Sequence, residues 1–193
     1  MANTCSIVAE ELHVGSISTF QSLSSRRLSN AVSLVMNARD VFVLGIGHSG
    51  YFGKVLAMKL NHVGVRAHTV FDGVNPRFER GDLFVAISQS GETATIVSLA
   101  STARRLGGRV LAISGNASSH LASISDCVLH LQIRPDQLEF PVLSALGEAK
   151  HKNLSGVLFG HCLYVLSYSI VVAVARANQE TAESIDGRHA TLQ

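Results

Sequence analysis

The chain has 193 residues, of which 47% are hydrophobic and 16% are charged, and its formal net charge is +2 at pH 7. This length allows one sizeable core, while the small charge, with no run of Lys or Arg, argues against a nucleic-acid partner. The three cysteines, Cys5, Cys127 and Cys162, show no CxxC, metal or disulfide spacing, which is typical of reduced thiols in a cytoplasm.

Residues 1–40 are predicted to form two helices, over 5–14 and 16–37, that pack on the rest of the chain. They contain the isolated basic pair Arg26-Arg27 but no clear helix-turn-helix and no basic recognition face. A basic stretch followed by an apolar run is also missing from the start, so no secretory signal is predicted. We therefore expect a cytoplasmic protein without DNA contacts of its own.

A first strand, over 41–44, runs into the glycine-rich turn 45–50 and then into a helix over 50–63. The Gly-x-Gly-x-x-Gly spelling of this turn matches a dinucleotide fingerprint, which also needs an acidic residue about twenty positions on. Asp72 lies near that spacing, but it falls beyond the next predicted strand, over 66–70. Nicotinamide or flavin binding is therefore the weaker interpretation of this turn.

The same construction recurs further along the chain, where a strand over 83–87 runs into Ser88-Gln89-Ser90-Gly91-Glu92-Thr93 and a helix over 93–106. The hydroxyls, the exposed backbone amides and the positive end of the helix dipole converge on one point, which suits a phosphate monoester. Small polar residues are also what an ordinary strand-to-helix turn uses, so that alternative stays open. Two such turns at one edge of a parallel sheet favour the phosphate site.

The remaining elements continue the alternation of strands and helices. Further strands are predicted over 109–113 and 127–131, with a short helix near 118–123 between them. Near-continuous apolar runs of this kind are typical of parallel strands covered on both faces. The sequence therefore predicts an α/β fold, a three-layer α/β/α sandwich around a five-stranded parallel sheet.

The last part of the chain is a loop over 132–155, an apolar helix over about 157–175 and a terminal helix that ends near Asp186. The apolar segment has almost the length of a membrane span, but Gly, His and Ser residues interrupt it and its flanking charges show no strong asymmetry. A helix buried in the core and in a subunit interface is the better interpretation. We expect residues 1–193 to form one domain, and no membrane association.

The two turns and the tail Gly187-Arg188-His189-Ala190-Thr191-Leu192-Gln193 resemble the sugar isomerase (SIS) domain family, and within it the 6-phospho-3-hexuloisomerases. The spelling of the second turn is also similar to the isomerase half of glucosamine-6-phosphate synthases. The resemblance implies a flavodoxin-like sheet, a phosphorylated sugar as ligand, no metal or organic cofactor, and a homodimer or homotetramer whose active sites borrow residues from neighbours. The predicted substrate-binding residues are Gly47, Ser49, Ser88, Gln89, Ser90 and Thr93.

Interconversion of 3-hexulose 6-phosphate and fructose 6-phosphate through an enediol needs a general base and a group that protonates or polarises the oxygen. The catalytic candidates are His48, Glu92, Glu148, His161 and His189. His189 comes first, because the resemblance implies that a histidine of the terminal motif reaches an active site, commonly in an adjacent subunit. Related aldose-ketose isomerases place a catalytic glutamate in the loop that holds Glu148, where a surface carboxylate is an equal alternative.

The chain departs from the hexuloisomerase pattern at two positions. His48 stands where the family shows Arg and the pentose phosphate isomerases show Lys, and Gly160 replaces a family glutamate at the start of the last long helix. His161 is a candidate substitute for that glutamate, although a histidine on an apolar helix is more often a core residue. The alternative functions are a phosphosugar-sensing regulatory module and an isomerase acting on another sugar phosphate.

Overall fold

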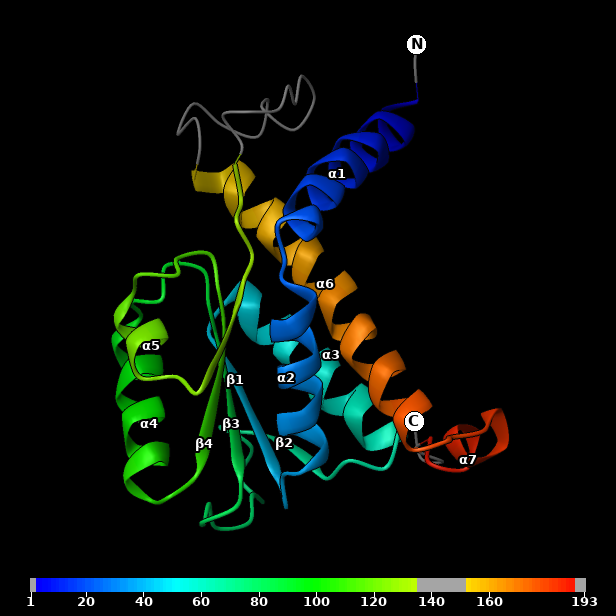
Figure 1. Ribbon diagram of the computed structural model, residues 1–193. Helices are drawn as coiled ribbons and strands as arrows, with labels where there is room; N and C mark the ends of the chain where they lie inside the picture. Colours follow the sequence, from blue (N-terminus) through cyan, green and yellow to red (C-terminus); the bar gives the residue numbers. More distant parts are fainter. Residues whose placement is uncertain (1–2, 135–151, 190–193) are drawn as a thin grey trace.

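The computed structural model describes residues 3–134 and 152–189 and contains a sheet of five parallel strands (Figure 1). The strands are β1 (Val41–Gly45), β2 (Ala67–Thr69), β3 (Leu83–Ser88), β4 (Arg109–Ser114) and β5 (Cys127–His130). They lie in the order β2-β1-β3-β4-β5, and every neighbouring pair is parallel. This is the doubly wound order of the flavodoxin-like sheet, so the predicted fold is confirmed.

Helices cover both faces of the sheet. They are α1 (Thr4–Gln21), α2 (Ser25–Met36), α3 (His48–His62), α4 (Ala94–Arg105), α5 (His120–Ser123), α6 (Lys152–Ala177) and α7 (Ala182–Asp186). The helices α2, α3 and α6 pack on one face, and α4 and α5 pack on the other (Figure 1). Successive strand side chains alternate between these layers, because Val41 and Val43 join the first core and Phe42 and Leu44 join the second.

The long apolar helix α6 belongs to the core of the first layer. Its stretch Ser155–Ala177 is long and apolar enough to cross a membrane, with a mean hydropathy of 2.0, but 56% of that apolar window is buried against the rest of the protein. Phe159 and Leu163 are almost completely buried there, and each such side chain contributes roughly 1.5–3 kcal/mol relative to exposure. Burial also raises the pKa of the Cys162 thiol to about 11, so this cysteine is an inert core residue.

The helix predicted over 16–37 is wrong, since the structure divides this stretch between α1 and α2. Ser22 ends the first helix, and its hydroxyl donates to the Thr19 carbonyl at 2.7 Å. Ser24 begins the second helix as its N-cap, where its hydroxyl accepts from the Arg27 N–H at 3.4 Å. Serine side chains compete for backbone groups in this way, so Ser22 and Ser24 favour a helix end and a helix start at these positions.

Candidate functional site

The sheet brings the two predicted turns together at one edge. β1 and β3 are paired in register from Val41 with Leu83 to Gly45 with Ile87, so both strands end at the same level. The helix that follows β1 lies on one face of the sheet, and the helix that follows β3 lies on the other. This is the switch point of a doubly wound sheet, the place where such folds bind ligands.

The first turn holds the start of α3 directly above the end of β1. A Cβ atom at Gly45 would lie 2.6 Å from the carbonyl carbon of Ser49, and one at Gly50 would lie 2.9 Å from the Gly45 carbonyl oxygen. Gly47 adopts a φ of 59°, which side chains rarely tolerate, and it is the N-cap of α3. Gly45 and Gly50 therefore allow close packing, and Gly47 allows a left-handed backbone, next to the point where Ser49 lines the site.

The second turn is held in shape by its own hydroxyls. The Ser88 and Thr93 hydroxyl oxygens lie 3.0 Å apart, and Ser88 also accepts from the Gly91 N–H at 3.1 Å. The Ser90 hydroxyl accepts from the Glu92 N–H at 3.2 Å. The turn is therefore preorganised before any ligand arrives.

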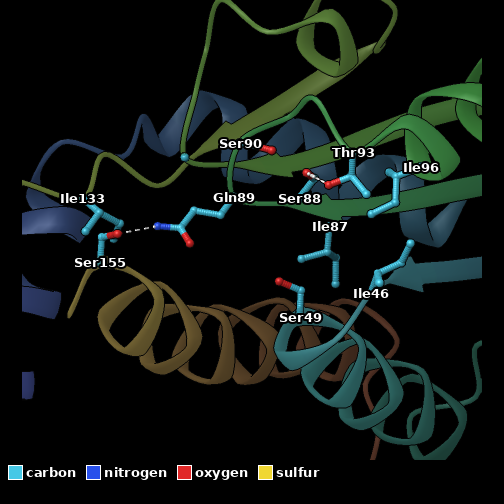
Figure 2. Close-up of a pocket in the computed structure, with 11 residues that line it drawn as sticks. Ile46, Ser49, Ile87, Ser88, Gln89, Ser90, Thr93, Ile96, Ile133 and Ser155 are labelled. Carbon is cyan, nitrogen blue, oxygen red and sulfur yellow. Dashed lines mark hydrogen bonds between the residues drawn. The ribbon is translucent and has the colours of Figure 1, made fainter. Parts of the chain in front are cut away.

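A cavity of about 680 Å³ lies between the two turns (Figure 2). It is lined by Ile46, Ser49, Ile87, Ser88, Gln89, Ser90, Thr93, Ile96, Gly115, Ile133 and Ser155. Among the described residues, the structure thus brings together all the predicted substrate-binding side chains, with Gly47 at the adjacent helix start. Every lining side chain that the structure describes is uncharged, so hydroxyl, amide and backbone groups are the polar contacts that this part of the wall offers to a ligand.

Two of the helices that begin at the cavity, α3 and α4, have open N-termini. The N-cap of α3 is Gly47, which has no side chain that could accept a hydrogen bond. The N-cap of α4 is Thr93, whose hydroxyl bonds Ser88 and does not cap the helix. The helices α1, α2, α5 and α7 all have a side chain that accepts a hydrogen bond at this position. The first-turn N–H groups of α3 and α4 therefore lack this partner and suit an anion.

Gly115 and Ser155 line the cavity but were not predicted from the sequence, and both form hydrogen bonds with the predicted residue Gln89. Gln89 donates from Nε2 to the Ser155 hydroxyl at 3.0 Å and thereby connects the second turn to α6 (Figure 2). Gly115 follows β4, and its N–H donates to the Gln89 carbonyl at 3.0 Å. Gly115 could have been predicted, because β4 is a third strand that ends in Ser and is followed by Gly. Ser155 could not, because its contact with the cavity depends on how α6 crosses the edge of the sheet.

Glu92 contributes to the structure of the second turn through a pair with His120. One carboxylate oxygen accepts from the backbone N–H of His120 at 3.0 Å, and the other lies 2.5 Å from the His120 Nδ1. The hydrogen bond from His120 lowers the pKa of Glu92, and the same bond raises the pKa of His120. Glu92 thus joins the turn to the start of α5, and its catalytic role stays a prediction.

This pair predicts a pH-dependent difference between wild type and Glu92→Gln. The lowered pKa of Glu92 stabilises the fold above its ordinary value of 4.5, and the raised pKa of His120 stabilises it below its ordinary value of 6.5. We expect the variant to melt at a lower temperature than wild type. The difference in melting temperature should be largest in the range from pH 4.5 to pH 6.5 and smaller above neutrality. Thermal melts from pH 4 to pH 8 measure it, with the exposed Glu10→Gln as control; a difference that grows above neutrality would contradict the assignment.

The histidine candidates lie in three different places. His48 is the first residue of α3, and its ring packs over Gly160. His161 lies on α6, where burial and, to a lesser degree, the charge of His13 lower its pKa, and it is not among the described lining residues. Glu148 lies outside the described residues.

His189 lies at the far end of α3 from the cavity. Its ring stacks on His62, the last residue of α3, with centroids 3.9 Å apart. Arg188 holds this arrangement by donating from Nη1 to the His62 carbonyl at 3.2 Å and to Glu180 at 2.7 Å. Since His62 lies thirteen residues beyond Ser49, the helix separates the histidine pair from the cavity of the same chain by about 20 Å.

His62 is a residue that sequence reasoning missed. Among the described side chains, its Nδ1 is the buried polar atom that has no hydrogen-bond partner. Burial, followed by the charge of His189, lowers its pKa, which favours the neutral ring. No pattern around residue 62 could have indicated this, because the contact forms only when the terminal segment folds back on α3.

The described residues include no group of three His, Cys, Asp or Glu side chains that could hold a metal ion. Among the acidic and histidine side chains that the structure describes near the cavity, Glu92 and His120 pair with each other. The described hydroxyl, amide and imidazole groups at this edge of the sheet can form hydrogen bonds to an anion and exchange a proton.

Comparison with known proteins shows how this architecture is classified. The SIS domain profile matches residues 34–149, which include both turns and the strands β1 to β5. The chain belongs to the SIS domain family. A 3-hexulose-6-phosphate isomerase of Mycobacterium gastri is 27% identical to this SIS protein over 195 residues, which cover 100% of this chain and 92% of that one.

Solved structures of similar fold extend the comparison. A crystal structure of a protein described as hypothetical superposes on this SIS domain with a TM-score of 0.86 and 27% identity, covering 98% of this chain and 97% of that one. The Vibrio vulnificus protein NanR, solved in complex with ManNAc-6P, has a TM-score of 0.74 at 21% identity, covering 97% of this chain and 67% of NanR. The second likeness concerns the fold alone.

Proposed function

We propose that the protein is a phosphosugar isomerase that interconverts 3-hexulose 6-phosphate and fructose 6-phosphate. The observation that carries the proposal is the pair of open helix N-termini and hydroxyl-rich turns that face one cavity at the switch point of the sheet. Such a site suits the dianion of a phosphate ester. The Mycobacterium gastri relative named 3-hexulose-6-phosphate isomerase supports the choice of sugar.

The reaction moves protons and requires no change in total oxidation state. A base removes the proton from the carbon beside the carbonyl, the enediolate forms, and a proton returns to the neighbouring carbon while the two oxygens exchange their roles as hydroxyl and carbonyl. Side chains suffice for these transfers, so the proposal includes neither a metal nor an organic cofactor. The serines, Gln89 and the helix N-termini hold the phosphate end and orient the sugar above them.

We further propose that His189 serves the cavity of a second copy, in a homodimer or homotetramer. Within one chain His189 lies at the opposite end of α3 from the cavity, so it has no access to its own site. The exposed stripe of Tyr164, Tyr168 and Val172 along α6 supports association, since these residues recur every four positions on one face of the helix. In the same proposal residues 1–193 act as one cytoplasmic domain.

A phosphosugar-sensing regulatory module is the second candidate function. It is favoured by the structure of RpiR from Sphaerobacter thermophilus, which is described as a transcription factor and whose sugar isomerase domain has this fold. The two functions differ in whether a proton leaves the sugar. A sensor binds the phosphosugar without exchanging any carbon-bound proton with solvent, whereas an isomerase exchanges such a proton.

Incubation of wild-type protein with fructose 6-phosphate in heavy water tests the proposal. We expect deuterium to enter the sugar at the carbons that take part in the enediol, and the 3-keto isomer to accumulate to equilibrium, both followed by NMR. Thermal stabilisation by the same sugar reports binding in parallel. Binding without deuterium uptake would assign the sensor function, and the absence of both would reject the phosphosugar site.

Ser49→Ala is expected to weaken fructose 6-phosphate binding by about 10- to 100-fold, because a hydrogen bond to a charged acceptor contributes roughly 1.5–3 kcal/mol. Ser49 lines the cavity from the first turn of α3 (Figure 2). The matched control is Ser101→Ala on α4, whose exposed hydroxyl donates to the Val97 carbonyl at 2.9 Å. Isothermal titration compares the two variants, and equal affinities would remove Ser49 from the binding site.

A further inference from the structure

The imidazole of His48 occupies the space next to Gly160 that a side chain at that position would need. A Cβ atom at Gly160 would lie 2.3 Å from Cε1 of His48 and 2.9 Å from its Nδ1. Real Cβ atoms do not approach other atoms so closely, so the ring in its present place and any side chain at residue 160 exclude each other. The two residues share one position between α3 and α6.

The ring is held in this place by its neighbours. His48 packs edge-on against Phe52, one turn further along α3, with centroids 5.0 Å apart. Phe52 in turn lies 2.9 Å from the same Cβ position and contacts Tyr164 of α6, with centroids 6.4 Å apart. One side of the imidazole is thus supported by an aromatic ring and a bare helix backbone, while the residue as a whole stays exposed.

The position of His48 relates it directly to the cavity. It immediately precedes Ser49, which lines the cavity, at the N-terminus of α3. On α6, Ser155 bonds Gln89 in the cavity wall, and Gly160 follows little more than one helical turn later. His48 is not itself among the described lining residues, but it is exposed and lies between Ile46 and Ser49, which do line the cavity, so it belongs to the rim of the site.

We propose that His48 is an acid-base group of the reaction, and that Gly160 is the residue that makes room for it. The inference rests on the proposed isomerase function and assigns one of its proton carriers. The imidazole accepts a proton from the substrate as the enediolate forms and returns one as the enediolate collapses, so the ring ends as it began. Gly160 takes part only by leaving the ring its space, because a side chain at that position would collide with the imidazole.

The test compares deuterium uptake into fructose 6-phosphate by wild type, His48→Gln, Gly160→Ala and Gly156→Ala. His48→Gln keeps a planar polar side chain but removes the titrating group, and we expect a loss of at least about 100-fold in turnover. Gly160→Ala displaces the ring, and we expect about a tenfold loss or more. Gly156→Ala is the matched control on the same helix, because its Cβ would meet no described atom closer than Gln89 Oε1 at 3.9 Å, and it should keep the wild-type rate.

A second experiment separates acid-base chemistry from a purely structural role. His48→Ala combined with Gly160→Glu moves the titratable group from α3 to α6, and we expect it to be more active than His48→Ala alone. The pH dependence of kcat/KM should also lose one ionisation in His48→Gln and regain one at lower pH in the double variant. A double variant no more active than His48→Ala would contradict the claim that the two residues share one position.

The outcomes distinguish the inference from the function on which it rests. If wild type exchanges no deuterium, the isomerase function fails and the role of His48 fails with it. If wild type exchanges and His48→Gln does so at the same rate with the same pH profile, the function stands and His48 is not a proton carrier. Equal rates for Gly160→Ala and Gly156→Ala would likewise overturn the inference.

Discussion

Gly91→Ala is expected to abolish phosphosugar binding and to lower the free energy of unfolding by about 2–4 kcal/mol. Gly91 adopts a φ of 69° in the second turn, and a Cβ atom there would lie 2.0 Å from the hydroxyl oxygen of Ser119. Ser119 is buried and is the N-cap of α5, so it cannot retreat without uncapping that helix. The turn must then move, and its hydroxyls and amides leave the cavity.

Two measurements check this result, namely chemical denaturation for stability and isothermal titration with fructose 6-phosphate for binding. The matched control is Gly73→Ala, since a Cβ atom at the exposed Gly73 would meet no described atom within 4 Å. We expect the control to change stability by no more than about 0.5 kcal/mol. Normal binding by a folded Gly91→Ala protein would show that the second turn does not form the phosphate site.

The fold was predictable because its signals are local. Apolar runs such as Val110-Leu111-Ala112-Ile113 identify buried parallel strands, and the turns after β1 and β3 mark their carboxyl ends. Parallel strands end at one edge of a sheet, so the sequence alone also placed Ser49 near residues 88–93. The division between α1 and α2 was missed, because serines favour caps yet also occur inside helices, and the choice depends on packing.

The candidate acid-base residues could not be placed in the same way. His48 and Gly160 are 112 positions apart in the chain, and although His48 was a catalytic candidate, nothing in the sequence indicated that it contacts Gly160. Their contact exists because α3 and α6 pack together on one face of the sheet. The stacking of His189 on His62 likewise depends on Arg188, whose guanidinium binds the last turn of α3 and fixes the terminal segment. Neither contact has a signature in local sequence.

The position of this histidine pair carries the second large prediction. His189→Ala is expected to reduce turnover by at least about 100-fold while leaving the fold intact, because the side chain is exposed and the Arg188 contacts do not depend on it. A loss on this scale would come from a residue about 20 Å from the cavity of its own chain. The decisive question is then which copy the ring serves.

Mixing two inactive variants answers it. Ser49→Asp places a carboxylate at the phosphate position, where it repels the substrate while suiting the N-terminus of α3, so this variant should fold and fail to bind. In a mixed dimer with His189→Ala, one site combines an intact cradle from one subunit with an intact His189 from the other. Random mixing of a two-site dimer then restores about a quarter of wild-type activity. Mixtures that form dimers by size-exclusion chromatography yet stay as inactive as their parents would show that His189 does not act across subunits, and the proton carriers would have to come from the chain that binds the phosphate.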